Sequence, residues 1–167
     1  MTEGAGTDVI DNLAGLSPDS PLAALRRERP DIVTHTQGSD DAIFRPKDDA
    51  GLTRAERAAA ALRIAHDLRD EILIAHYRER LQALDPSEVL AESVAADVEP
   101  KDKRWATILA HVDRVTNDPE SAQPSDLQAL GSAGLSPHAI VSLSQLIAYV
   151  NFQSRVLAGL RMLREAK

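Results

Sequence analysis

The sequence has 167 residues, a formal net charge of −7 and no cysteine. A chain of this length is typical of one domain with a sizeable hydrophobic core. Without cysteine it has no disulfide, no thiolate nucleophile and no cysteine-based zinc site. Its acidity argues against nucleic acid as a partner, because binding to phosphates relies on clustered basic side chains.

Composition predicts an all-α protein. Hydrophobic residues make up 43% of the chain and aromatic residues only 3%, so alanine, leucine, isoleucine and valine must fill the core. Alanine and leucine favour helices, and no segment has the alternation of β-branched residues typical of a strand. No apolar stretch reaches the ~20 residues needed to span a bilayer, and the amino terminus lacks a signal-peptide pattern. We therefore expect a cytoplasmic protein without a membrane partner.

The chain is predicted to begin with an arm. Residues 1–27 are rich in glycine, aspartate, serine and proline at first, with a brief apolar run from Val9 to Leu16 that predicts one docking helical turn. A short helix over 21–28 follows. We expect this arm to precede one helical domain over residues 28–167.

The domain is predicted to start with a helix from Pro30 to Phe44, since proline suits the first helical position. Thr53 and Glu56 then form a capping-box pattern. No glycine or proline follows until after Leu84, which predicts a long central helix with a bend near Leu68.

Three further helices are expected in the second half of the chain. Asp85 and Pro86 resemble a helix start, and that helix should end near Asp97. The next ones are predicted over 101–115 and from a cap at Ser125 to Gly134.

The last helix is predicted from Ser136-Pro137 to about Glu165. Its apolar stripe is wider than the ~100° that one core contact needs, so we expect this helix to form an oligomer interface, with Asn151 and Arg155 fixing the register. The stripe comprises Ile140, Val141, Leu143, Leu146, Ile147, Val150, Val156, Leu157 and Leu160.

Several segments, in order and spacing, resemble the carboxymuconolactone decarboxylase/alkylhydroperoxidase D family, in particular its peroxidase-related branch. The similarity covers about residues 28–162. The matching segments are RPDIV at 29–33, GLTRAER at 51–57, DLQAL at 126–130, AGLS at 133–136 and IAYVNF at 147–152, followed by Arg155. The resemblance implies an alkylhydroperoxidase D-like (AhpD-like) helical bundle that assembles as a trimer or a hexamer.

Redox-active members of that family carry a Cys-x-x-Cys pair one helical turn before a histidine, and a glutamate upstream. Placing His76 on the family histidine puts Arg69 and Ile72 at the two cysteine positions. The family glutamate falls on Arg57, with Glu56 one residue out of register. Neither arginine nor isoleucine replaces a thiolate, so peroxide reduction by that route is excluded. A peroxidase (peroxiredoxin) label inherited through the family would not fit this chemistry.

His76 is the leading candidate for a functional residue. An imidazole titrates near neutral pH and serves as a general acid or base, with Arg69 and Arg80 on the same helical face. We take His76, Arg69 and Glu56 as candidate catalytic residues. The alternative is an inert histidine held at a helix interface.

A metal site and a cofactor are not expected. His66 and Asp70 are four residues apart on one helical face, which resembles half of a metal site. The remaining histidines lie on other predicted elements, so a solvated helix pair is the better interpretation of these two residues.

Two functions remain open from the sequence. The first is a cofactor-free decarboxylase or isomerase that uses His76 and a nearby arginine on a small acid. The second is a non-catalytic oligomeric binding or assembly partner that kept the fold. A cavity in which His76 and an arginine converge would favour the enzyme, whereas a filled apolar core would favour the partner.

Overall fold

The computed structural model describes residues 8–87 and 100–166, and these ranges contain helices and no strand. The predicted all-α class is therefore confirmed. The helices are α1 (Val9–Leu13), α2 (Pro21–Arg27), α3 (Pro30–Phe44), α4 (Arg54–Asp67), α5 (Glu71–Gln82), α7 (Lys103–Asn117), α8 (Pro124–Ser132) and α9 (Pro137–Glu165), with a 3-10 turn η1 (Pro119–Ser121) between α7 and α8. The helix predicted to end near Asp97 lies outside the described residues.

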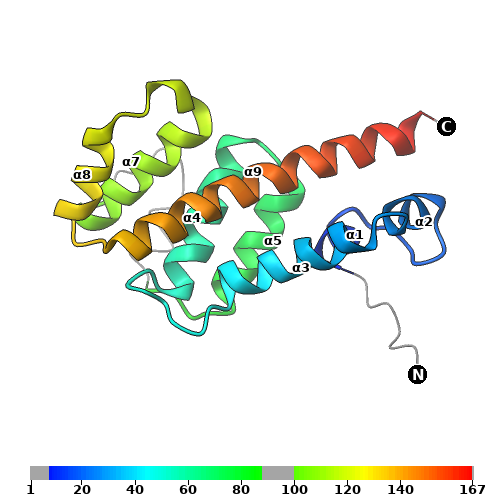
Figure 1. Ribbon diagram of the computed structural model, residues 1–167, viewed down its shortest axis with the longest axis horizontal. Coiled ribbons are helices and arrows are strands. Elements are labelled where there is room, and N and C mark those ends of the chain that lie inside the picture. The colour runs from blue at the N-terminus through cyan, green and yellow to red at the C-terminus, as the bar shows by residue number, and fades with distance from the viewer. Residues whose placement is uncertain (1–7, 88–99, 167) are drawn as a thin grey trace.

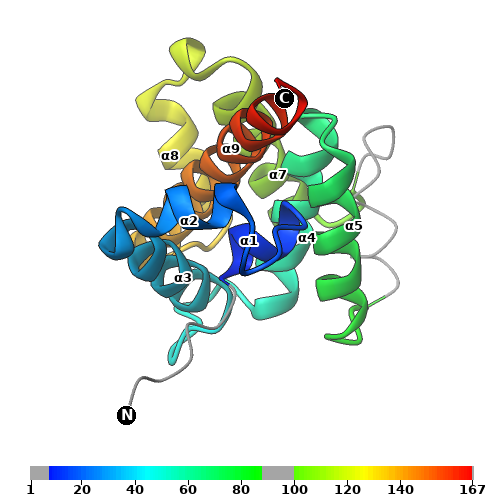
Figure 2. The ribbon, with the colours of Figure 1, turned by 90° about the vertical axis from the view of Figure 1, so that its right-hand side faces the viewer.

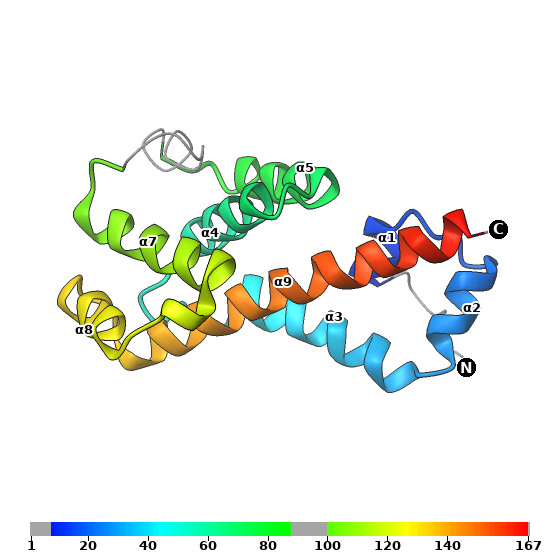
Figure 3. The same cartoon turned by 90° about the horizontal axis from the view of Figure 1, so that it is seen from above.

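Helix α9 is the longest of these helices and runs from one end of the described structure to the other (Figure 1). Seen from above, α4 and α5 lie on one side of it and α3 on the other, with α7 and α8 near its start and α1 and α2 near its end (Figure 3). Most of its apolar side chains face the neighbouring helices, whereas Val141, Phe152 and Met162 are exposed. Six residues of the predicted stripe are buried within this single chain, namely Leu143, Leu146, Ile147, Val150, Leu157 and Leu160.

Helix α4 lies at the centre of the packing, against α5, α7 and α9. Its four consecutive alanines at 58–61 are fully buried, so side chains on every face of this helix contact other elements. Small side chains let neighbouring backbones approach closely, which explains how one helix contacts four others, namely these three and α3. The low aromatic content of the sequence therefore reflects a core built around alanine.

The predicted long central helix is wrong as one continuous helix, but the predicted bend near Leu68 marks the place where the chain breaks into α4 and α5, with a sharp turn between them. Arg69 has φ +53°, the left-handed conformation that ends a helix. The Asp70 N–H donates to Ala65 O at 3.1 Å and the Arg69 N–H donates to His66 O at 3.0 Å, which is the Schellman arrangement. The Asp70 side chain then caps α5 by accepting from the Leu73 N–H. Glycine usually occupies the left-handed position, so an arginine there concealed the break.

Most predicted helix starts are observed. Thr53 and Glu56 form a reciprocal capping box at α4, and Ser136 caps α9 by accepting from the Ala139 N–H. The start of α8 differs from the prediction, because Gln123 rather than Ser125 is the cap residue and pairs with Asp126. Pro124 occupies the first turn, so α8 starts two residues earlier than predicted.

The arm packs into the same core as the rest of the described chain. Ile10 is fully buried, and α1 contacts α3, α5 and α9. Arg26 of α2 pairs with Asp8 at 2.7 Å and also with Asp11, which joins the two arm helices. The domain boundary at residue 28 stays a prediction. Within the described ranges, no helix combines the length and apolarity needed to cross a membrane.

Candidate functional site

His76 lies in α5, at a place where two cavities meet. The first cavity, about 630 Å³, lies between α1, α3 and α5, and Figure 2 shows α1 between the other two helices. The second, about 470 Å³, lies between α5 and the end of α3. Both cavities are lined by Arg45, His76, Glu79 and Arg80. The two cavities therefore adjoin along α5, and together they are called the cleft.

The Nε2 atom of His76 is buried and has no hydrogen-bond partner. Leaving a buried polar atom unpaired costs about 1–3 kcal/mol. The ring lines both cavities, whereas Nε2 itself is covered, so a molecule in the cleft reaches this atom only when a lining side chain moves.

Burial lowers the pKa of His76, and the nearby Arg80 guanidinium lowers it further, while Asp40 and Glu79 act in the opposite direction. The net effect favours the neutral imidazole at pH 7. A neutral imidazole has one nitrogen that accepts a proton and one that donates a hydrogen bond. The site is thus suited to a base rather than to a permanent cation.

Arg80 is held in place from two directions. Asp40 of α3, which is 1% exposed, accepts from its guanidinium at 2.8 Å. The guanidinium also lies over the Phe44 ring, 4.2 Å from the ring centroid, a favourable cation–π geometry. Arg80 is therefore fixed beside His76 by contacts from a helix distant in sequence.

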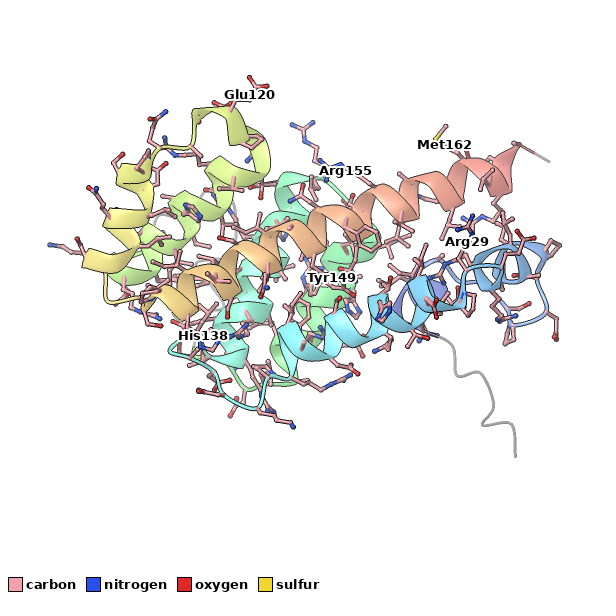
Figure 4. All side chains as sticks on the ribbon, in the orientation of Figure 1. Arg29, Glu120, His138, Tyr149, Arg155 and Met162 are labelled. Atoms are coloured by element: carbon pink, nitrogen blue, oxygen red, sulfur yellow. The ribbon has the colours of Figure 1, made fainter. Side chains whose placement is uncertain are left out.

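A chain of buried, hydrogen-bonded polar groups joins α5, which lines the cleft, to α9 and α3. The Tyr77 hydroxyl donates to Gln153 Oε1, the Gln153 amide donates to the Tyr149 hydroxyl at 3.2 Å, and that hydroxyl donates to Thr36 O at 3.3 Å. Tyr149 lies near the middle of α9 (Figure 4). Burial raises the pKa of Tyr77 and of Tyr149, so both hydroxyls stay protonated. This chain joins α5, α9 and α3 and holds the helix that carries His76.

The structure does not bring the three candidate catalytic residues together. Arg69 occupies the left-handed turn before α5 and is exposed. The Glu56 carboxylate accepts from the Thr53 N–H at 2.8 Å and pairs with Arg104 of α7, and it lines a different cavity of about 480 Å³ beside Trp105. Of the three, only His76 lines the cleft.

His66 and Asp70 do not act as a pair. Asp70 is buried and accepts from Ser154 Oγ at 3.0 Å and from Arg161 at 3.2 Å, so its carboxylate ties the start of α5 to α9. The pKa of His66 is lowered by burial and then by Arg78. In the part of the chain that the structure describes, no group of three or more potential ligands is placed to hold a metal ion.

The charged residues of the cleft are Asp40, Arg45, Arg54, Glu79 and Arg80. Arg80 has a sequence signal, because it follows His76 by four residues and shares its helical face. Asp40 and Arg45 lie more than thirty residues before His76 and had no such signal. They reach the cleft only because α3 packs against the rest of the fold.

No protein-family profile and no curated protein matches the sequence. The fold is similar to the crystal structure of an uncharacterised peroxidase-related protein from Silicibacter sp. TM1040, with a TM-score of 0.69 and 16% sequence identity. The match covers 77% of this chain and 68% of that chain. At this identity the likeness concerns the fold alone, and it agrees with the resemblance of the sequence to peroxidase-related proteins.

Proposed function

We propose that this chain is a cysteine-free member of the carboxymuconolactone decarboxylase/alkylhydroperoxidase D family that binds a small organic acid in the cleft beside His76. The observation that supports it best is His76, whose ring lines both cavities and whose buried Nε2 atom has no hydrogen-bond partner. A ligand that reaches this atom would supply the missing hydrogen bond. The similarity in fold to a peroxidase-related protein agrees with the family, and the absence of cysteine excludes thiol chemistry.

The chemistry that fits the cleft is proton transfer without a cofactor. Neutral His76 accepts a proton from a carbon next to a carbonyl group of the bound acid, and the resulting imidazolium returns it at the same or another carbon. The guanidinium groups of Arg45 and Arg80 stabilise the negative charge that develops on the acid. Return to another carbon is an isomerisation, and protonation after loss of carbon dioxide is a decarboxylation.

The alternative is a binding or assembly partner without catalysis. The covered position of Nε2 favours it, since an inert histidine at a helix interface is also shielded. Under this alternative the acid binds and no proton is exchanged. The enzyme and the binding partner therefore differ in whether a proton of the bound acid is exchanged, which can be measured.

Proton exchange in deuterated water tests the proposal without knowledge of the product. The protein is mixed with short-chain oxo acids, and loss of the carbon-bound proton signal next to the carbonyl is followed by NMR. We expect exchange above the protein-free rate, and we expect His76→Gln to reduce it by roughly 10²-fold, the scale of a lost general base.

His138→Gln is the matched control, because His138 is exposed at the start of α9 (Figure 4). It should leave the rate unchanged. Equal rates in the wild-type protein and the His76→Gln variant would refute the proposed role of His76. Binding of an acid without exchange would support the assembly or binding partner instead.

A further inference from the structure

The two cavities beside His76 differ in net charge. In the cavity between α1, α3 and α5, Asp40 and Glu79 balance Arg45 and Arg80. In the cavity at the end of α5, Glu79 faces three arginines, namely Arg45, Arg54 and Arg80. The second cavity is thus lined by more arginines than carboxylates, and of its arginines Arg80 is paired with Asp40 and Arg45 with Asp41.

Two of the three arginines can be engaged by a ligand. The Arg54 guanidinium donates to Pro46 O at 3.3 Å, which is a neutral acceptor. Arg45 pairs with Asp41 in a contact where both side chains are about half exposed, and such surface pairs are weak. Arg80 remains with its buried partner Asp40. A carboxylate at this end of the cleft would therefore be held by Arg54 and Arg45.

The walls of this second cavity are apolar. Phe44 is buried, and Ala83 and Leu84 lie past the carboxy-terminal end of α5. Leu84 is 38% exposed. A hydrocarbon body placed on Ala83 and Leu84 would remove apolar surface from water.

We infer that the cavity formed by Phe44, Arg45, Arg54 and Leu84 is a recognition subsite for a hydrophobic monocarboxylate. This inference rests on the proposed function, because it names the class of acid that the cleft takes. A second carboxylate on the ligand would lie against Leu84 or in the charge-balanced cavity, where nothing compensates its loss of water. A monocarboxylate with an aliphatic chain therefore fits better than a dicarboxylate of equal length.

Three matched probes separate these classes, namely octanoate, octanedioate and octanamide. Calorimetry with the full chain should show octanoate binding at least about tenfold more tightly than either of the others, because one Coulombic contact plus apolar burial is available only to octanoate. Equal or tighter binding of octanedioate would overturn the inference, as would no binding of octanoate.

Variants then assign the subsite. Arg54→Gln and Leu84→Asn change exposed residues and should each weaken octanoate binding about 3- to 10-fold. Arg29→Gln is the control, since Arg29 is exposed at the junction of α2 and α3, away from the cleft (Figure 4). If Arg54→Gln and Arg29→Gln bind octanoate equally, the subsite is not where we place it. Proton exchange is measured separately on the oxo acids, so octanoate binding together with no exchange of the oxo acids contradicts the proposed enzyme and leaves the subsite supported.

Discussion

Burial controls the ionisable side chains that matter most in this chain. His76, His66 and His111 all have a pKa below the usual histidine value, in each case chiefly because of desolvation. His111 of α7 also has a buried Nδ1 atom without a hydrogen-bond partner. These histidines are neutral in the folded protein, so their protonation favours the unfolded state.

The free energy of unfolding should therefore decrease as the pH falls below about 6.5, the pKa of histidine in an unfolded chain. Each such histidine contributes at most about 1.4 kcal/mol per pH unit, and only between its folded and unfolded pKa values. Urea unfolding near pH 7.5 and near pH 5 measures the decrease. His76→Gln should show a smaller decrease than the wild-type protein, whereas His35→Gln, at an exposed position of α3, should not. An equal decrease in all three proteins would contradict the lowered pKa of His76.

Arg57 is the residue at which the family glutamate falls, and here it has a structural task. It is 2% exposed and donates to three backbone carbonyls, those of Leu52 at 2.9 Å, Ile43 at 3.1 Å and Asp49 at 3.1 Å. These bonds tie the segment between α3 and α4 to the start of α4. The same segment contains Arg45, so Arg57 supports one wall of the cleft.

We expect Arg57→Met to lower the free energy of unfolding by about 3 kcal/mol or more, because it leaves buried carbonyl groups without donors. Chemical denaturation measures the change. Arg78→Met is the matched control at an exposed position of α5, and it should change stability by less than about 0.5 kcal/mol. Equal effects of the two substitutions would show that the carbonyls find other partners.

At the scale of the elements, helix starts and helix ends were not equally predictable. Starts carry capping side chains and prolines, as Thr53, Ser136 and Pro30 illustrate. The end of α4 depends instead on a backbone conformation that an arginine adopts at Arg69. A residue other than glycine in the left-handed conformation is strained by its Cβ atom. The residue type at such a position does not indicate this strain in the sequence.

The same contrast applies to the site. His76 and Arg80 could be paired from their spacing in one helix. Asp40 and Arg45 could not, because their approach depends on how α3 packs against α5. Glu56 was expected near His76 from the family pattern, yet its carboxylate completes the cap of α4. Contacts between residues of one helix could therefore be predicted from the sequence, whereas contacts between helices distant in sequence could not.

Replacing Arg69 with glycine should stabilise the protein by about 0.5–1 kcal/mol, because glycine adopts positive φ without a Cβ clash. Arg69→Ala keeps the Cβ atom and should give no comparable gain. Thermal unfolding compares the two variants. Loss of stability in Arg69→Gly would contradict the helix-ending turn. Loss of proton exchange in this variant would restore Arg69 as a catalytic candidate.

At the scale of the whole molecule, most of the apolar stripe on α9 is covered by the chain itself. Val9 and Ile10 of the arm are buried, and α1 and α2 both contact α9. The face of α9 that is exposed to solvent differs from the side that the arm and the other helices cover. Its exposed positions Val141, Ala148, Phe152, Arg155 and Met162 fall within roughly 80° of one another at 100° per residue.

This outer face carries the last prediction, which is a homo-oligomer, expected to be a trimer or a hexamer. Val141, Phe152 and Met162 are 55%, 40% and 70% exposed, and exposed apolar patches rimmed by polar residues commonly mark interfaces. Arg155 is the one charged residue among these five positions, and it donates to the backbone and side-chain oxygens of Asn151. Figure 4 shows Arg155 and Met162 projecting on the same side of α9.

Sedimentation velocity at micromolar concentrations tests this assembly. We expect a species larger than the 18.1 kDa chain, and we expect Phe152→Glu to shift it toward the monomer, because a buried unpaired carboxylate at an interface is costly. Leu127→Glu is the control, since Leu127 is 47% exposed on α8 and lies outside this face. A wild-type species near 18 kDa without concentration dependence would refute the oligomer and favour the arm as a cover of the apolar stripe within the single chain.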